Sequence, residues 1–110
     1  MLIERPDVMV WGGGSGGVAA AIQAARSGAV TLLFTPGPWL GGMVSAAGVS
    51  APDGHELSSW QTGLWGALLH ELESREPSGL DHNWVSCFGF RPERAEQILQ
   101  DWVQRESRLE

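Results

Sequence analysis

Six residues, Gly12-Gly13-Gly14-Ser15-Gly16-Gly17, constrain the fold of this chain more than any other part of the sequence. The apolar run 7–11 precedes them and is typical of a strand buried on both faces in a parallel sheet. The alanine-rich segment 18–26 follows and predicts a helix, with Gly28 just past its end as a left-handed cap. Residues 30–34 form a second β-branched and apolar run. Strand, glycine turn, helix and strand within about thirty residues predict a βαβ unit with parallel strands.

The glycine spacing Gly12-x-Gly14-x-x-Gly17 fits the dinucleotide-binding fingerprint, in which each glycine has its own steric reason. The first permits a tight turn, the second lets backbone approach a pyrophosphate, and the third allows the helix to pack closely on the strand. Free N–H groups around Ser15 and Gly16, at the start of the helix, are expected to point at the phosphates. The flanking strands and helix fall where the fingerprint requires them, so we interpret the loop as a nucleotide site.

Position 35 departs from the fingerprint, which calls for an acidic residue at the end of the second strand to accept the ribose hydroxyl hydrogens. Thr35 stands there instead. Its hydroxyl can still bond to a ribose, but without charge assistance, which roughly halves the strength of the contact. The substitution argues against a generic NAD site, and the fingerprint alone does not identify the cofactor.

The second half of the chain predicts two more helices and a strand. A leucine repeat with Trp60 and Trp65 predicts a helix that begins at Ser58 or Ser59 and ends before residues 76–79. Residues 84–90 predict a strand. Pro92 suits the first turn of a last helix, whose apolar stripe includes Trp102.

Composition excludes several classes of function. The 110 residues carry a net charge of −6 with seven arginines and no lysine, which disfavours nucleic acid as a partner. No apolar run approaches the ~20 residues of a membrane span, and the first residues lack a signal-peptide core, so we expect a cytoplasmic protein. The single cysteine, Cys87, excludes an internal disulfide. His70-Glu71 lacks the second histidine of a zinc-protease motif, and we predict no metal site.

Two stretches carry a family resemblance. Residues 7–34, DVMVWGGGSGGVAAAIQAARSGAVTLLF, resemble the N-terminus of FAD-dependent oxidoreductases of the glutathione-reductase structural type. PWLGGMVSAAGV, residues 38–49, is similar to the Gly-Gly segment that lies beside the flavin in many of these proteins. Residues 90–103 more loosely resemble the segment that precedes the next strand in the broad FAD-dependent oxidoreductase family. Thr35 stands where the family usually has glutamate, and a threonine at this position resembles the tRNA-modifying flavoproteins of the same superfamily.

The resemblance implies FAD as the cofactor and assigns site residues by match. Thr35 would lie near the adenosine ribose, and Trp39 is a further candidate neighbour of the flavin. The residues implied to hold the pyrophosphate are Gly12, Gly14, Ser15, Gly16 and Gly17, and those implied to lie on the flavin side are Gly41, Gly42 and Met43.

We therefore expect an α/β, Rossmann-like βαβ unit with additional helices, forming an incomplete FAD-binding domain. Residues 1–50 would hold the βαβ unit and the Gly-Gly flavin loop, and residues 51–110 a helical extension and a strand–helix segment of the same domain. The expected function is the FAD-binding N-terminal part of a flavin-dependent oxidoreductase, with the remainder of a larger chain as its partner. Hydride or electron transfer with an unidentified small-molecule substrate would belong to that parent enzyme, and no catalytic residue can be named. An NAD(P)-binding unit and a truncated, non-catalytic module are the alternatives.

Overall fold

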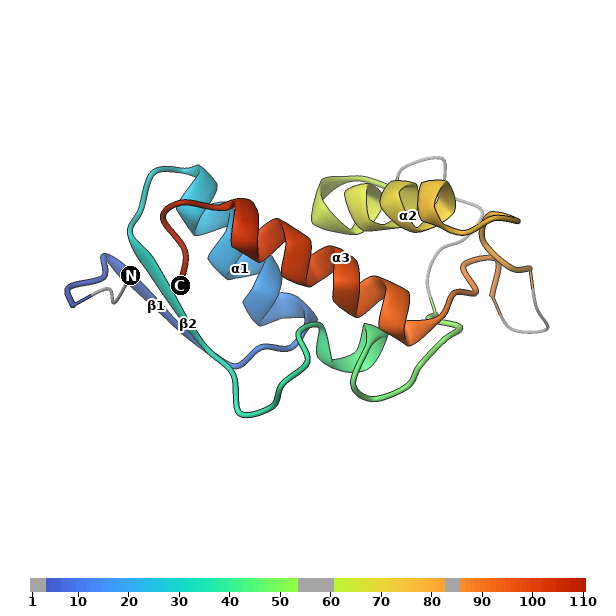
Figure 1. The fold of residues 1–110 in the computed structure, drawn as a ribbon, viewed down its shortest axis with the longest axis horizontal. Helices are drawn as coiled ribbons and strands as arrows, with labels where there is room; N and C mark the ends of the chain where they lie inside the picture. The colour runs from blue at the N-terminus through green and yellow to red at the C-terminus, as the bar shows by residue number, and fades with distance from the viewer. Residues whose placement is uncertain (1–3, 54–60, 83–85) are drawn as a thin grey trace.

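The computed structural model describes residues 4–53, 61–82 and 86–110. In chain order its elements are β1 (Val8–Trp11), α1 (Ser15–Arg26), β2 (Thr31–Phe34), the 3₁₀ helix η1 (Gly42–Val44), α2 (Gly63–Arg75) and α3 (Pro92–Arg105). β1 and β2 pair in parallel, in register from Val8–Thr31 to Trp11–Phe34, and α1 packs against both strands (Figure 1). Gly28 has φ +99° directly after α1, as expected for the cap. The predicted βαβ unit is confirmed, with each strand beginning one residue later than expected.

A third chain segment lies along the free edge of β2. The Thr31 N–H donates to the Arg108 carbonyl and the Leu33 N–H to the Glu110 carbonyl, each at 2.7 Å. Leu109 forms a parallel bridge with Thr31, and the C-terminus lies beside β2 in Figure 1. Residues 108–110 therefore take the position of a third parallel strand, in agreement with the resemblance of residues 90–103 to a segment that precedes a strand.

The expectation that the first strand is buried on both faces is wrong. Met9 is 61% exposed and Trp11 86% exposed, and Trp11 contacts the ring of Phe34 at a centroid distance of 5.5 Å. Val10 points the other way, toward α1, because successive side chains of a strand alternate between its faces. An apolar sequence predicts a strand, but it does not show which face a neighbouring element covers.

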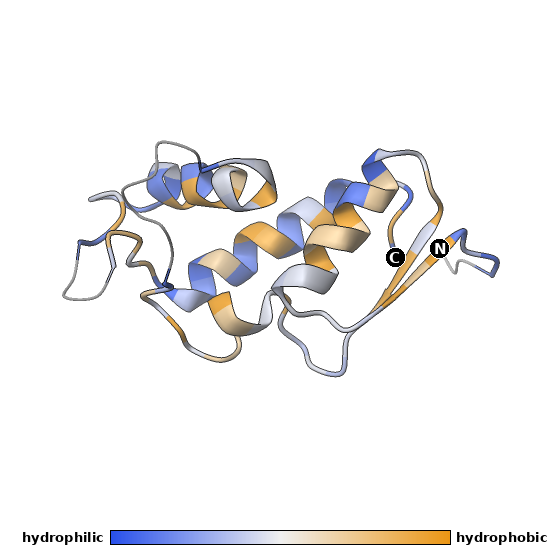
Figure 2. Cartoon of the chain, turned by 180° about the vertical axis from the view of Figure 1, so that it is seen from behind, coloured by the Kyte–Doolittle hydropathy of each residue, from blue (hydrophilic) through white to orange (hydrophobic). Residues whose placement is uncertain are grey.

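One hydrophobic core joins the two halves of the chain. Trp102 is buried in it as the helical stripe predicts, Trp65 packs at its margin, and Trp60 lies outside the described residues. Figure 2 shows hydrophobic and hydrophilic residues alternating along α3, which lies between α1 and α2 in Figure 1. The buried members of the core are Val18, Ile22, Leu40, Val44, Leu68, Leu72, Phe90, Ala95, Ile98, Leu99 and Trp102.

The boundaries of α2 differ from the expectation. The helix begins at Gly63, residues 61 and 62 are not helical, and residues 58–60 lie outside the described part. Gly63 has φ +64°, a left-handed conformation that does not fit the interior of a right-handed helix. The Trp65 Nε1–H donates to Gln61 Oε1 at 2.9 Å, so the residues before the helix are still tied to it.

The strand expected over residues 84–90 is absent from its described part, residues 86–90. A single antiparallel bridge joins Asp81 to Gly89. Ser86 Oγ donates to the Pro52 carbonyl at 2.9 Å and accepts the Phe88 N–H at 3.0 Å. A serine that bonds to nearby backbone in this way competes with a strand ladder, which explains the error.

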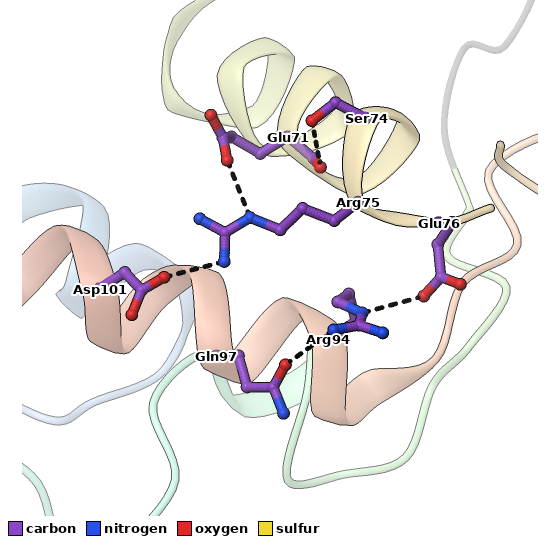
Figure 3. Close-up of polar contacts among 7 residues, drawn as sticks. All are labelled: Glu71, Ser74, Arg75, Glu76, Arg94, Gln97 and Asp101. Carbon is purple, nitrogen blue, oxygen red and sulfur yellow. Dashed lines mark hydrogen bonds and ion pairs between the residues drawn. The ribbon is translucent and has the colours of Figure 1, made fainter.

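Ion pairs hold α2 against α3 (Figure 3). Arg75 on α2 donates to Glu71 on its own helix at 3.0 Å and to Asp101 on α3 at 2.8 Å. The hydrogen bond that Arg75 donates to Asp101, with the bond to Glu71 and the charge of both carboxylates, raises the pKa of Arg75, although its burial opposes this. The pairs fix the helix that supplies one wall of the pocket described below.

Glu76 forms the second set of ion pairs, and this pairing predicts that the stability of the fold depends on pH. Arg91 and Arg94 donate to its carboxylate at 3.1 and 3.4 Å. These bonds lower the pKa of Glu76 from its ordinary 4.5, and the bond from Arg91 has the largest effect. The resulting stabilisation is present above about pH 4.5 and is lost as the pH falls through the lowered value. We expect Glu76→Gln to lower the free energy of unfolding by up to about 1 kcal/mol near neutral pH, with the difference from the parent chain shrinking in acid.

Urea denaturation at several pH values measures this difference. Glu73→Gln is the matched control, because Glu73 is exposed on α2 and forms no ion pair within the described residues. A Glu76→Gln effect that stayed constant down to about pH 3 would show that the ion pairs contribute nothing.

The packing of α1 on β1 depends on Gly17. A Cβ at Gly17 would lie 2.9 Å from the carbonyl carbon of Gly12 and still closer to its oxygen, so no side chain fits there. Gly12 itself turns out of the strand with φ +115°, and its N–H donates to the Phe34 carbonyl at 2.7 Å. The steric reasons given above for the first and third glycines of the fingerprint match this geometry.

We expect Gly17→Ala to destabilise the fold by about 1–3 kcal/mol, the usual cost of forcing an extra methyl group into a packed site. Gly16→Ala is the control, because its Cβ would meet no atom within 4 Å and alanine favours a helix. Thermal unfolding followed by circular dichroism compares the two. Equal melting temperatures would contradict the close contact.

Candidate cofactor-binding site

The start of α1 is open and polarised. Gly14 is its N-cap residue, and within the described chain no side chain caps this helix and no acidic residue stands in its first turn. The first intrahelical bond runs from the Val18 N–H to the Gly14 carbonyl at 2.9 Å, so the N–H groups of the first turn have no partner in the helix. Together with the helix dipole they form a site that favours an anion.

The space above this helix start is free of protein. A Cβ built on Gly14 or on Gly16 meets no atom within 4 Å. Gly14 has φ −67° and ψ 178°, an extended conformation that any residue can adopt. The backbone does not require glycine at position 14, and the room left there suits a group that approaches the main chain closely.

The structure brings the glycine loop and the Gly-Gly segment together. The Gly41 N–H donates to the Gly13 carbonyl at 2.8 Å, and Gly41 forms a parallel bridge with Gly14. A Cβ on Gly42 would lie 3.0 Å from the Gly14 Cα. Gly41 and Gly42 have φ +109° and +54°, conformations that glycine adopts without strain. Two motifs far apart in the sequence thus form one backbone surface.

Helix α3 holds the Gly-Gly segment in place. The Leu40 N–H donates to Glu96 Oε1 at 3.4 Å, and Gln100 donates to the same oxygen at 2.8 Å. Ser45, which is 1% exposed, donates its hydroxyl to the Leu40 carbonyl. A Cβ on Gly41 would lie 2.6 Å from Leu99, so the segment fits tightly on α3. Sequence reasoning assigned no role to Glu96, because its partner Leu40 is distant in the chain, or to Ser45, because no motif indicates its bond to Leu40.

Thr35 lies at the glycine loop, as its position at the end of β2 predicts. Its hydroxyl is exposed and donates to the Gly37 carbonyl at 3.3 Å. A Cβ on Gly13 would lie 2.6 Å from the Thr35 Cβ, so the threonine packs directly against the loop. Gly13 was missed as a structural residue, because the fingerprint accepts any residue at its position.

A pocket of about 490 Å³ opens beside this surface. Ser15 and Gly16 from the start of α1, Met43 from η1 and Trp65 from α2 contribute to its largely apolar lining. Asp53 is its only charged lining residue within the described part of the chain. Of the residues assigned to the flavin side, Met43 lines the pocket, whereas Trp39 does not.

The other sequence candidates lie elsewhere or outside the described residues. His70 and His82 are exposed, Cys87 is half-buried, and His55 is not described. Within residues 4–53, 61–82 and 86–110 no group of three potential metal ligands is found. No helix in this part of the chain is long and apolar enough to cross a membrane.

Comparison with known proteins identifies the family. No curated protein and no solved structure gives a match. The family profile of FAD dependent oxidoreductases matches residues 7–110, which include both glycine motifs, α2 and α3. The match favours FAD over the NAD(P) alternative. Because it spans nearly all of the sequence, the chain belongs to the FAD dependent oxidoreductase family, and it is a flavin-binding part of such an oxidoreductase with FAD as the cofactor.

Proposed function

We propose that the glycine loop and the Gly-Gly segment form a single cradle for FAD. The observation that carries this proposal is the hydrogen bond from the Gly41 N–H to the Gly13 carbonyl, which joins the two motifs. Thr35 would contact the adenosine ribose. The pyrophosphate would lie on Gly12, Gly14, Ser15, Gly16 and Gly17, and the flavin side would meet Gly41, Gly42 and Met43.

The start of α1 fits a pyrophosphate in chemistry and in space. Unpaired N–H groups of the first turn supply donors, and the open volume at Gly14 and Gly16 admits the phosphates to within bonding distance of backbone. The net charge of −6 does not oppose this, because exposed charges farther than about 10 Å away are screened at ordinary ionic strength.

The two ends of the cradle suit different parts of FAD. The exposed Thr35 hydroxyl can exchange its bond to Gly37 for a ribose hydroxyl. Met43, which directly follows Gly42 and is 61% exposed, offers an apolar contact to a flat ring. Bound FAD supplies hydride or electron transfer, while this chain binds and orients it. The division into residues 1–50 and 51–110, the cytoplasmic location and the small-molecule substrate stay predictions from the sequence.

Gly14→Val tests the cradle. The side chain can be accommodated without backbone strain but enters the space proposed for the phosphates, so we expect FAD affinity to fall at least tenfold while the circular dichroism spectrum stays unchanged. FAD retention after desalting and a fluorescence titration measure the affinity. Ala20→Val, an exposed substitution on α1 outside the cradle, serves as the control and should bind FAD like the parent chain.

Equal FAD binding by Gly14→Val would refute the pyrophosphate contact. A folded parent chain that takes up no added FAD would refute the cradle for this chain. If the chain binds FAD, loss of the flavin absorbance on addition of NAD(P)H would show reduction of the flavin. That result would contradict the alternative of a truncated, non-catalytic module.

A further inference from the structure

Asp53 is a charged side chain of the pocket that the cradle does not use. It lines the pocket together with Ser15 at the start of α1 and Trp65 of α2, and it is exposed at the mouth. Within the described chain its side chain forms no hydrogen bond or ion pair. An exposed carboxylate at the edge of an apolar surface attracts a ligand that brings the opposite charge and repels one that brings the same charge.

We propose that this pocket receives the substrate and that the substrate is an apolar amine, whose ammonium group pairs with Asp53. The inference rests on the proposed function, since the amine would lie beside the FAD cradle. Its apolar part would fill the space between Met43 and Trp65.

The charges around the pocket disfavour an anionic substrate. All seven arginines are described, and none of them lines the pocket. Arg26, Arg75, Arg91 and Arg94 are already held in ion pairs with glutamates or aspartate. Among the described residues that line the pocket, positive potential comes from the start of α1, which the pyrophosphate would occupy.

The walls of the pocket fit an apolar group of moderate size. A volume of about 490 Å³ lies in the usual range for small-molecule sites. The ring of Trp65 is held by the bond to Gln61 and by an edge contact with Phe88 at 5.9 Å, and Leu64 and Leu68 complete the wall from α2. A neutral apolar ligand would fill this space but would not gain the charge interaction with the Asp53 carboxylate.

Three probes of similar shape test the charge preference: benzylamine, benzyl alcohol and benzoate. We expect calorimetric titration of the full chain, with and without added FAD, to show benzylamine binding about fivefold more tightly than benzyl alcohol at low ionic strength, and benzoate most weakly. The preference should shrink as salt is added. Asp53→Asn should abolish the preference, whereas Asp81→Asn, an exposed aspartate outside this pocket, should keep it.

Benzoate binding as tightly as benzylamine, or an unchanged preference in a folded Asp53→Asn variant, would overturn the proposal. The salt dependence of the parent chain gives a test that requires no variant. FAD retention separates the two hypotheses: an amine preference lost in Asp53→Asn but found in a chain that takes up no FAD supports the amine pocket and refutes the cradle. If the parent chain retains FAD, the Gly14→Val variant loses it, and neither shows an amine preference, the cradle is supported and the amine pocket is refuted.

Discussion

The hydrogen bond from the Gly41 N–H to the Gly13 carbonyl is the contact on which the candidate site depends, because it joins a strand–helix turn to a loop that follows the second strand. The approach is possible only where side chains are absent. A Cβ on Gly42 would press on the Gly14 backbone, and one on Gly13 would collide with Thr35. Fifteen glycines, eleven of them at or before Gly54, are an excess for a chain of this length. The geometry explains part of that excess as close backbone contact between two loops.

The contact is maintained by elements that come later in the chain. Glu96 on α3 accepts the Leu40 N–H, and Leu99 of the same helix lies against Gly41. The same helix leads to residues 108–110, which pair with the edge of β2. Ion pairs of Arg75 and Glu76 then fix α2 on α3. The alignment of the two glycine motifs is therefore a property of the whole core, and changes in α3 are expected to reach the site without touching a ligand.

Features set by local sterics could be predicted from the sequence, and features set by distant neighbours could not. The cap at Gly28 and the first-turn Pro92 follow from backbone rules that concern a few residues. The exposure of Trp11 does not, because burial depends on what covers the sheet. The lack of a strand over the described residues 86–90 has the same cause, since Ser86 bonds to the carbonyl of Pro52, which lies far back in the chain.

The candidate site follows the same division. The residues proposed for the pyrophosphate could be named because a spacing encodes a turn, whereas Asp53 and Trp65 carry no motif and line one pocket only because the fold brings them there. The family match spans both kinds of residue, but it names a family and not the role of any position. Roles outside the fingerprint have to be argued from the structure.

The pocket lining contains two groups with opposite electrostatic preferences, and this difference can orient a ligand. The start of α1 attracts negative charge through its backbone N–H groups, whereas the Asp53 carboxylate at the mouth repels it. A phosphate placed against Asp53 would meet a like charge, so a binding mode that brings the phosphates to this side chain is disfavoured. In the proposed cradle Asp53 thus acts on FAD by repulsion and on an amine by attraction. One side chain would then serve both to fix the direction of the cofactor and to select the charge of the substrate.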